Sequence, residues 1–298
     1  MTTHHPNPHG NLLTGQVEAI SAEKQAELIR TFDTESNFRK LVGPVGLFVT
    51  TIAVVLSSFH IYTAGFGLLV EIKHRAFHLA LVLALIFLVF PHKRPPQDAR
   101  QAVKTWGWSL AFTAFYLYLA WALVDRLTVL GALGGNGWAF VALVGLVAFI
   151  SLPFPQFGGT GDRTSWVDWP LAAVAASVSL YFIVFFNDVF IARVGAPIAQ
   201  DYMMGVLAIV IVMEATRRTM GPLLPVLGMA CLLYALLGRY MPGILAHRGY
   251  SVDRVVNHIY VGTEGIYGIA VGVVATYVFH FVLFGILAQM TGLGRLFM

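Results

Sequence analysis

Charged side chains are scarce in this chain. Asp, Glu, Lys and Arg make up 11% of its 298 residues, against about 25% in an average soluble domain. The mean hydropathy is +0.74, so a soluble globular domain is excluded, because too few polar side chains remain to cover the core. The single cysteine, Cys231, excludes an internal disulfide. Because it lies in an apolar run, we expect it to be a small packed residue.

The first 40 residues also lack the short apolar core and cleavage site of a secretory signal peptide. They are polar, with three histidines near the start, and we expect residues 1–40 to form a cytoplasmic polar tail. The net charge of +4 is spread over loops and forms no compact basic patch. Nucleic acid is therefore not an expected partner, whereas the lipid bilayer is.

Long apolar runs fill most of the remaining chain. Runs of this kind predict helices, because a membrane β-barrel would instead show short segments of alternating polarity. The expected fold class is an all-α, polytopic helical membrane protein with about eight transmembrane helices and one amphipathic surface helix. The expected spans are 41–62, 76–90, 106–124, 138–152, 169–186, 202–215, 223–237 and 269–288.

The distribution of basic residues predicts how the chain is oriented in the membrane. Lys93, Arg94, Arg100 and Lys104 form the most basic loop, and basic loops favour the cytoplasmic side. We therefore expect this loop and the amino terminus to be cytoplasmic. The segment 251–268 then lies outside. Its valines recur at i, i+3 and i+4, which predicts an amphipathic helix capped by Ser251 that lies flat on the membrane or is docked against other spans.

The motif EATRRTMGPLLP, from Glu214 to Pro225, separates two of the apolar runs. On a helix, Glu214 can reach both Arg217 and Arg218, because they follow it by three and four residues. One interpretation is a gate or a latch between domains. The other, which we favour, is an interfacial salt bridge that ends a helix and contributes little stability.

Three stretches carry a resemblance to a known family. They are EATRRTMGPLLP at 214–225, YMPGILAHRGYS at 240–251 and GTEGIYGIAVGVVATYVFHFVLFG at 262–285. Together they resemble the fused permease of TRAP transporters, the tripartite ATP-independent periplasmic carriers, in the subclass that uses TAXI-type binding proteins. The runs LSSFHIYTAGFG at 56–67 and AFHLALVLALIFLVFP at 76–91 are similar to the first two helices of the same proteins.

The resemblance implies a domain organisation. Residues 41–200 correspond to a small-subunit-like membrane domain, with an extra helical pair near 106–152, and residues 201–298 to the start of a large-subunit-like permease domain. In the family that domain continues further. The hairpins that bind ion and solute are therefore expected beyond Met298, and the chain is expected to be a fragment or one piece of a permease encoded in parts.

The function implied by the resemblance is that of a permease component in the bacterial inner membrane. A periplasmic TAXI-type solute-binding protein would deliver an organic solute, the remaining large-subunit region would complete the permease, and a sodium gradient would drive uptake. No bound cofactor, metal or enzymatic activity is expected. The alternatives are a non-transporting scaffold subunit and a membrane-embedded enzyme that uses His280 and Glu264.

Four further residues are candidates for a functional role. His280 lies near the middle of the last apolar run, where it is either a proton relay or a neutral imidazole bonded to a neighbouring helix. Glu264 lies between Gly262 and Gly265, and either caps the next helix or lines a path. Arg248 and Arg254 lie on the expected outer side and are candidates for docking the solute-binding protein.

Overall fold

The computed structural model describes residues 39–91, 99–129, 137–152, 164–193 and 195–292, and these residues contain helices and connecting segments but no strand. The expected all-α fold class is confirmed for this part of the chain. The principal helices are α2 (Gly43–Phe66), α3 (Glu71–Val89), α4 (Ala99–Val129), α5 (Gly137–Ile150), α6 (Asp168–Val184), α7 (Ala199–Met220), α8 (Leu223–Leu237), α9 (Val252–Val256), α10 (Ile269–Val273) and α11 (Phe279–Met290).

Six of the described helices are long and apolar enough to cross a membrane. These are α2, α3, α4 from Val103, α7, α8 extended to Tyr240, and the continuous run Ile269–Met290, in which α10 passes through a π-helical turn into α11. The helices α5 and α6 are apolar but shorter. By length and composition the chain is a helical membrane protein, and the count of eight spans stays a prediction.

Helix α3 begins earlier than its apolar run indicates. It starts at Glu71, whereas the expected span started at residue 76. Its first turns hold Glu71 and Arg75, which form an ion pair four residues apart. Arg75 also donates a hydrogen bond of 2.7 Å to the carbonyl oxygen of Tyr267. These contacts give the charges of Glu71 and Arg75 partners. The helix therefore extends through residues that hydropathy alone assigns to a loop.

The helices differ in how much of their surface is covered by protein. More than half of the apolar window is buried in α3 and in α7, whereas only 11% is buried in α2, in α8 and in the run Ile269–Met290. The exposed apolar side chains of these outer helices are suited to contact with lipid. Cys231 lies on α8 and is exposed, so the expectation that it is packed inside the protein is wrong.

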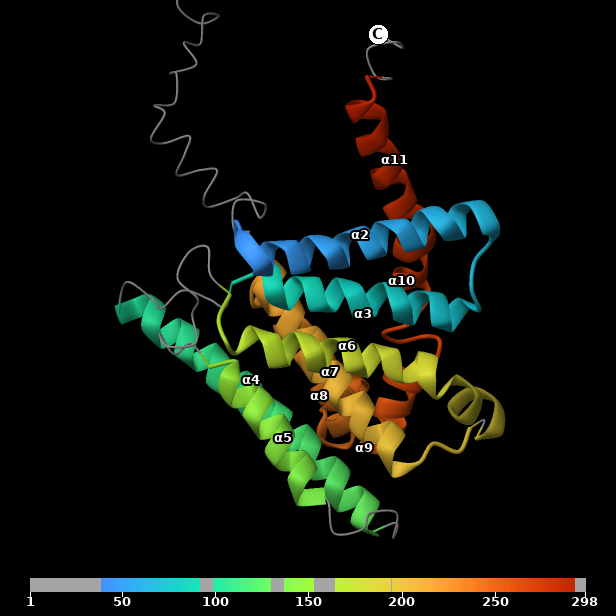
Figure 1. Cartoon of the computed structure of the whole chain (residues 1–298). Coiled ribbons are helices and arrows are strands. Elements are labelled where there is room, and N and C mark those ends of the chain that lie inside the picture. The colour runs from blue at the N-terminus through green and yellow to red at the C-terminus, as the bar shows by residue number, and fades with distance from the viewer. Residues whose placement is uncertain (1–38, 92–98, 130–136, 153–163, 194, 293–298) are drawn as a thin grey trace, which may run out of the picture. The chain divides into compact units, whose positions relative to one another are not determined.

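Helix α3 lies between α2 and α6, and α4 pairs with α5 (Figure 1). The backbone N–H of Arg39, just before α2, donates to the carbonyl oxygen of Val89 at the end of α3. The two helices are therefore antiparallel. Helix α7 packs on α3, α4, α6 and α8, which makes it the central helix of the described part.

The predicted amphipathic segment is docked against other helices. It forms α9 and a π-helical turn, Asn257–Val261, and packs on α4, α7 and α8. Val252, Val255, Val256 and Tyr260 are buried, whereas Arg254 and His258 are exposed. The predicted apolar face is therefore confirmed. Ser251 precedes the helix but its side chain makes no capping hydrogen bond, so that detail was wrong.

Two tyrosines attach this segment to α6. The Tyr260 hydroxyl donates to the carbonyl oxygen of Val178 at 2.7 Å, and the Tyr267 hydroxyl lies 3.2 Å from the Oγ of Ser179. Burial raises the pKa of both phenols. Both groups therefore stay protonated and keep a proton for these bonds.

The spacing of the glycines at 262, 265, 268 and 272 predicts close contact between helices. Only Gly272 makes such a contact, because a side chain there would meet the guanidinium of Arg75 on α3. Gly262, Gly265 and Gly268 instead lie against backbone atoms of residues 257–265. They permit a tight local turn between the π-helical segment and α10.

Candidate functional site

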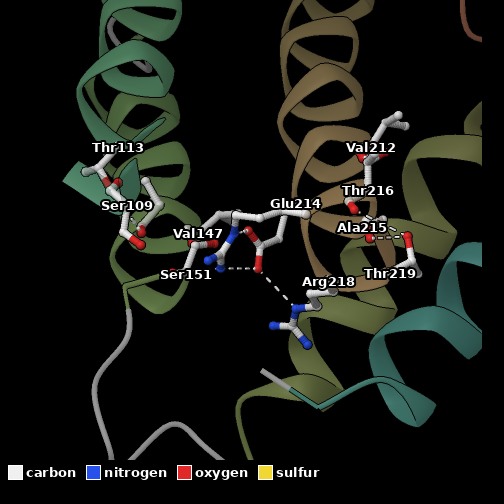
Figure 2. Close-up of polar contacts among 12 residues, drawn as sticks. Ser109, Thr113, Val147, Ser151, Val212, Glu214, Ala215, Thr216, Arg218 and Thr219 are labelled. Carbon is white, nitrogen blue, oxygen red and sulfur yellow. Dashed lines mark hydrogen bonds and ion pairs between the residues drawn. The ribbon is translucent and has the colours of Figure 1, made fainter. Parts of the chain in front are cut away.

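The central candidate site is a set of ion pairs at the end of α7. Glu214 lies between two guanidinium groups: Arg217 donates from Nε and Nη2 at 2.8 and 2.9 Å, and Arg218 donates from Nε at 3.0 Å. Figure 2 shows Glu214 directed from α7 toward Ser151 at the end of α5, with Arg218 on its other side. Arg217 also donates to the carbonyl oxygen of Ser151 at 2.9 Å.

Two residues that sequence analysis did not single out complete this set. Asp168, at the start of α6, accepts from Arg218 Nη1 at 2.8 Å and from Arg39 Nη1 at 2.6 Å. Arg39 also donates to the carbonyl oxygen of Leu88 at the end of α3. We call Arg39, Asp168, Glu214, Arg217 and Arg218 the arginine–carboxylate network.

The network is buried within the protein, whereas the expected low contribution of the salt bridge to stability assumes exposure to water. The side chains of Glu214 and Asp168 are at most 1% exposed, and those of the three arginines at most 4%. The expectation that the pair lies near the end of a helix is confirmed, since α7 ends at Met220. The expectation that the salt bridge contributes little to stability does not apply to a buried pair, because removing one member leaves an uncompensated buried charge.

The network carries a surplus of positive charge. Three arginines face two carboxylates, so one positive charge has no counter-charge among the network residues. Arg39 Nε and Nη2 and Arg218 Nη2 are buried and bond to no residue that the structure describes. The guanidinium of Arg218 also lies over the ring of Phe87, 4.8 Å from its centroid, which partly offsets the missing partner.

A second polar centre combines four histidines within the apolar helices. At its centre is His60 on α2. The ring centroids of His74 and His78 on α3 and of His280 on α11 lie 5.0–5.5 Å from the ring centroid of His60. His60 Nε2 is 2.8 Å from His78 Nδ1. We call these four residues the histidine cluster. Sequence analysis identified only His280, because the others lie on helices whose packing partners could not be predicted.

The hydrogen bonds restrict the protonation of these rings. His280 Nε2 lies 2.8 Å from the carbonyl oxygen of His60, and His74 Nε2 lies 3.3 Å from that of Ala275. A carbonyl oxygen only accepts, so both Nε2 atoms carry hydrogen. The predicted bond from His280 to a neighbouring helix is confirmed.

The Nδ1 atoms of His60, His74 and His280 are buried and bond to no described residue. In the neutral rings of His74 and His280 this atom is therefore an unpaired base. A cavity of about 380 Å³ lies beside His74 and is also lined by Glu71 and Arg75. The cluster thus places buried ring nitrogens without a hydrogen-bond partner in the described part of the chain. Among the described residues, no group of three or more His, Cys, Asp or Glu side chains is placed to hold a metal ion.

Glu264 is not brought to the histidine cluster. It is exposed in the turn before α10, and its carboxylate forms no hydrogen bond or ion pair with a described residue. The N-cap of α10 is Gly268, without a side-chain cap, so the predicted capping role of Glu264 is wrong. The pairing of Glu264 with His280 that an intramembrane enzyme would need is not formed in the described part.

The two candidate docking residues are both exposed. Arg248 lies in the segment between α8 and α9. Arg254 lies on the polar face of α9, beside a cavity of about 480 Å³ that is also lined by Tyr250 and His258. The neighbouring Asp253 lies 3.4 Å from Arg126 of α4, so α4 contacts the same segment.

No protein-family model, curated protein or solved structure matches the chain. The resemblance to the TRAP permeases therefore rests on the sequence stretches quoted above.

Proposed function

We propose that the chain is the scaffold part of the membrane component of a TRAP-type secondary transporter. A periplasmic TAXI-type receptor delivers an organic solute to the permease, and an ion gradient drives its uptake. The ion and solute sites lie in the remaining large-subunit region. The resemblance of three ordered stretches supports the family assignment.

One observation supports the scaffold role in particular. The Arg218–Asp168 ion pair joins α7 of the large-subunit-like region to α6 of the small-subunit-like region, with both side chains 1% exposed. The Arg217–Ser151 bond joins the extra pair α4–α5 to the same point. Buried charged contacts of this kind favour one arrangement of the helices, because any other leaves charges unpaired in an apolar environment.

Reconstitution tests this function. Proteoliposomes that contain residues 1–298, the large-subunit region and the receptor are expected to take up solute when an ion gradient is imposed. Residues 1–298 with the receptor alone are expected to give none. A sodium gradient and a pH gradient are compared, because the family implies sodium, whereas ionisable side chains such as those of the histidine cluster, within apolar helices, are candidates for moving protons. Uptake by residues 1–298 alone would contradict the placement of the sites. No uptake by the complete system under either gradient would contradict transport.

The receptor-docking role of Arg254 has its own test. In the complete system, Arg254→Glu is expected to slow receptor-dependent uptake and to change its salt dependence, because exposed charges mainly affect the rate of encounter. Arg239→Glu is the matched control: Arg239 is also exposed and follows α8. Equal uptake by both variants at every salt concentration would remove Arg254 from the docking surface.

A further inference from the structure

A cavity of about 440 Å³ lies where the start of α4 meets the break between α7 and α8. Its lining combines two cations, two hydroxyls, an indole and an apolar wall. The residues that carry the argument are Lys104, Trp108, Ser109, Arg217, Leu223 and Val226.

The polar part of this lining is positively charged. Lys104 is exposed and forms no ion pair with any residue in the described ranges. Arg217 uses Nε and Nη2 for its bonds to Glu214 and Ser151, and the two N–H donors of its Nη1 bond to no residue that the structure describes. Behind Arg217 lies the arginine–carboxylate network with its one surplus positive charge. The cavity therefore favours an anion.

The rest of the lining favours a ligand with an apolar chain. Leu223 is 77% exposed and Trp108 is 39% exposed, and both belong to helices that are apolar enough to span a membrane. Tryptophan at such a position is typical of the headgroup level of a bilayer. Lys104 lies in the first turns of α4 and belongs to the basic segment 93–104, which predicts the cytoplasmic side, where anionic lipids are abundant.

We propose that this cavity binds an anionic phospholipid. The phosphate lies between the Lys104 ammonium and the Arg217 guanidinium, and one acyl chain lies along Leu223 and Val226. A phosphate group is common to lipid and to free phosphate, but only the lipid also covers the apolar wall. This lipid holds the extra pair α4–α5 against α7 and α8, and the proposal does not depend on transport.

Native mass spectrometry of the purified chain in detergent tests the proposal. We expect each protein chain to retain one molecule of phosphatidylglycerol. We also expect it to bind phosphatidylglycerol more tightly than phosphatidylcholine with the same acyl chains. Lys104→Gln is expected to weaken the binding by about fivefold, the effect of one basic residue near a lipid headgroup. Val226→Phe, which narrows the apolar part without touching a charge, is expected to weaken the retention of both lipids. Arg126→Gln, a half-exposed cation at the other end of α4, is the control and is expected to change nothing.

Three outcomes would overturn the proposal. The first is equal binding of the two lipids by the unchanged chain. The second is lipid binding that neither Lys104→Gln nor Val226→Phe reduces. The third is displacement of phosphatidylglycerol by millimolar inorganic phosphate, which would assign the cavity to a free anion. Both variants leave the arginine–carboxylate network intact, and thermal unfolding of each confirms that it is folded before lipid is added.

Discussion

Glu214→Gln is expected to destabilise the folded protein by about 3–5 kcal/mol, the usual cost of removing one partner of a buried ion pair. Glu214 is the only carboxylate within hydrogen-bonding distance of Arg217 in the described part of the chain, and it is shared with Arg218. The amide cannot offset either positive charge. Losing the carboxylate charge raises the surplus positive charge of the network by one, and Arg39 and Arg218 already have buried donors that bond to no described residue.

Fluorescence-detected size-exclusion chromatography after heating measures this effect. Glu214→Gln is expected to lower the midpoint of thermal unfolding strongly, or to abolish the folded peak. Glu264→Gln is the matched control, because Glu264 is exposed and unpaired in the described structure. The double variant Glu214→Met with Arg217→Leu is expected to recover part of the loss, because removing both partners leaves fewer buried charges. Equal midpoints for Glu214→Gln and Glu264→Gln would contradict the burial of the network.

Gly265→Ala is the second substitution with a large expected effect. A Cβ at this position would collide with the carbonyl oxygen and Cα of Ile259. That oxygen accepts the hydrogen bond from the backbone N–H of Ile266 at 2.8 Å. Because backbone atoms cannot move aside as a side chain does, the turn between the π-helical segment and α10 has to open. We expect a loss of about 3 kcal/mol, at the upper end of the range for overpacking.

Opening this turn is also expected to release the segment that Tyr260 and Tyr267 attach to α6. Hydrogen exchange of residues 252–268 measures that release directly, and the unfolding midpoint measures the loss of stability. Gly285→Ala is the control, since a Cβ there meets nothing within 4 Å. If the two alanine variants exchange at the same rate, the turn is not closely packed.

The local features of the fold were predictable from the sequence because they depend on helical periodicity. A carboxylate three and four residues before two arginines bonds to both of them on any helix, and Glu214 does so. The valines from 252 to 256 form one face of a helix wherever it packs, and this face is buried. The positions of the apolar helices followed from hydropathy in the same way.

The long-range partners were not predictable. Arg39 and Asp168 are 129 residues apart, and Asp168 and Arg218 are 50 apart. Nothing in their spacing indicates contact. The position of Asp168 at the start of an apolar run was nevertheless a signal that this carboxylate needs a partner. The histidine cluster arises similarly, since His60 and His280 are 220 residues apart.

The sequence by itself thus determined the membrane class, the positions of the helices and the contacts within each helix. Only the tertiary structure decided that Glu214 is buried, that His280 belongs to a cluster, that α9 is docked and that Cys231 is exposed. The physical reason is that a repeat of 3.6 residues specifies which side chains share a face. Which helix meets that face, and at what depth, depends on the packing of the whole chain, because many alternative pairings of apolar helices bury similar areas and differ mainly in whether their few charges find partners.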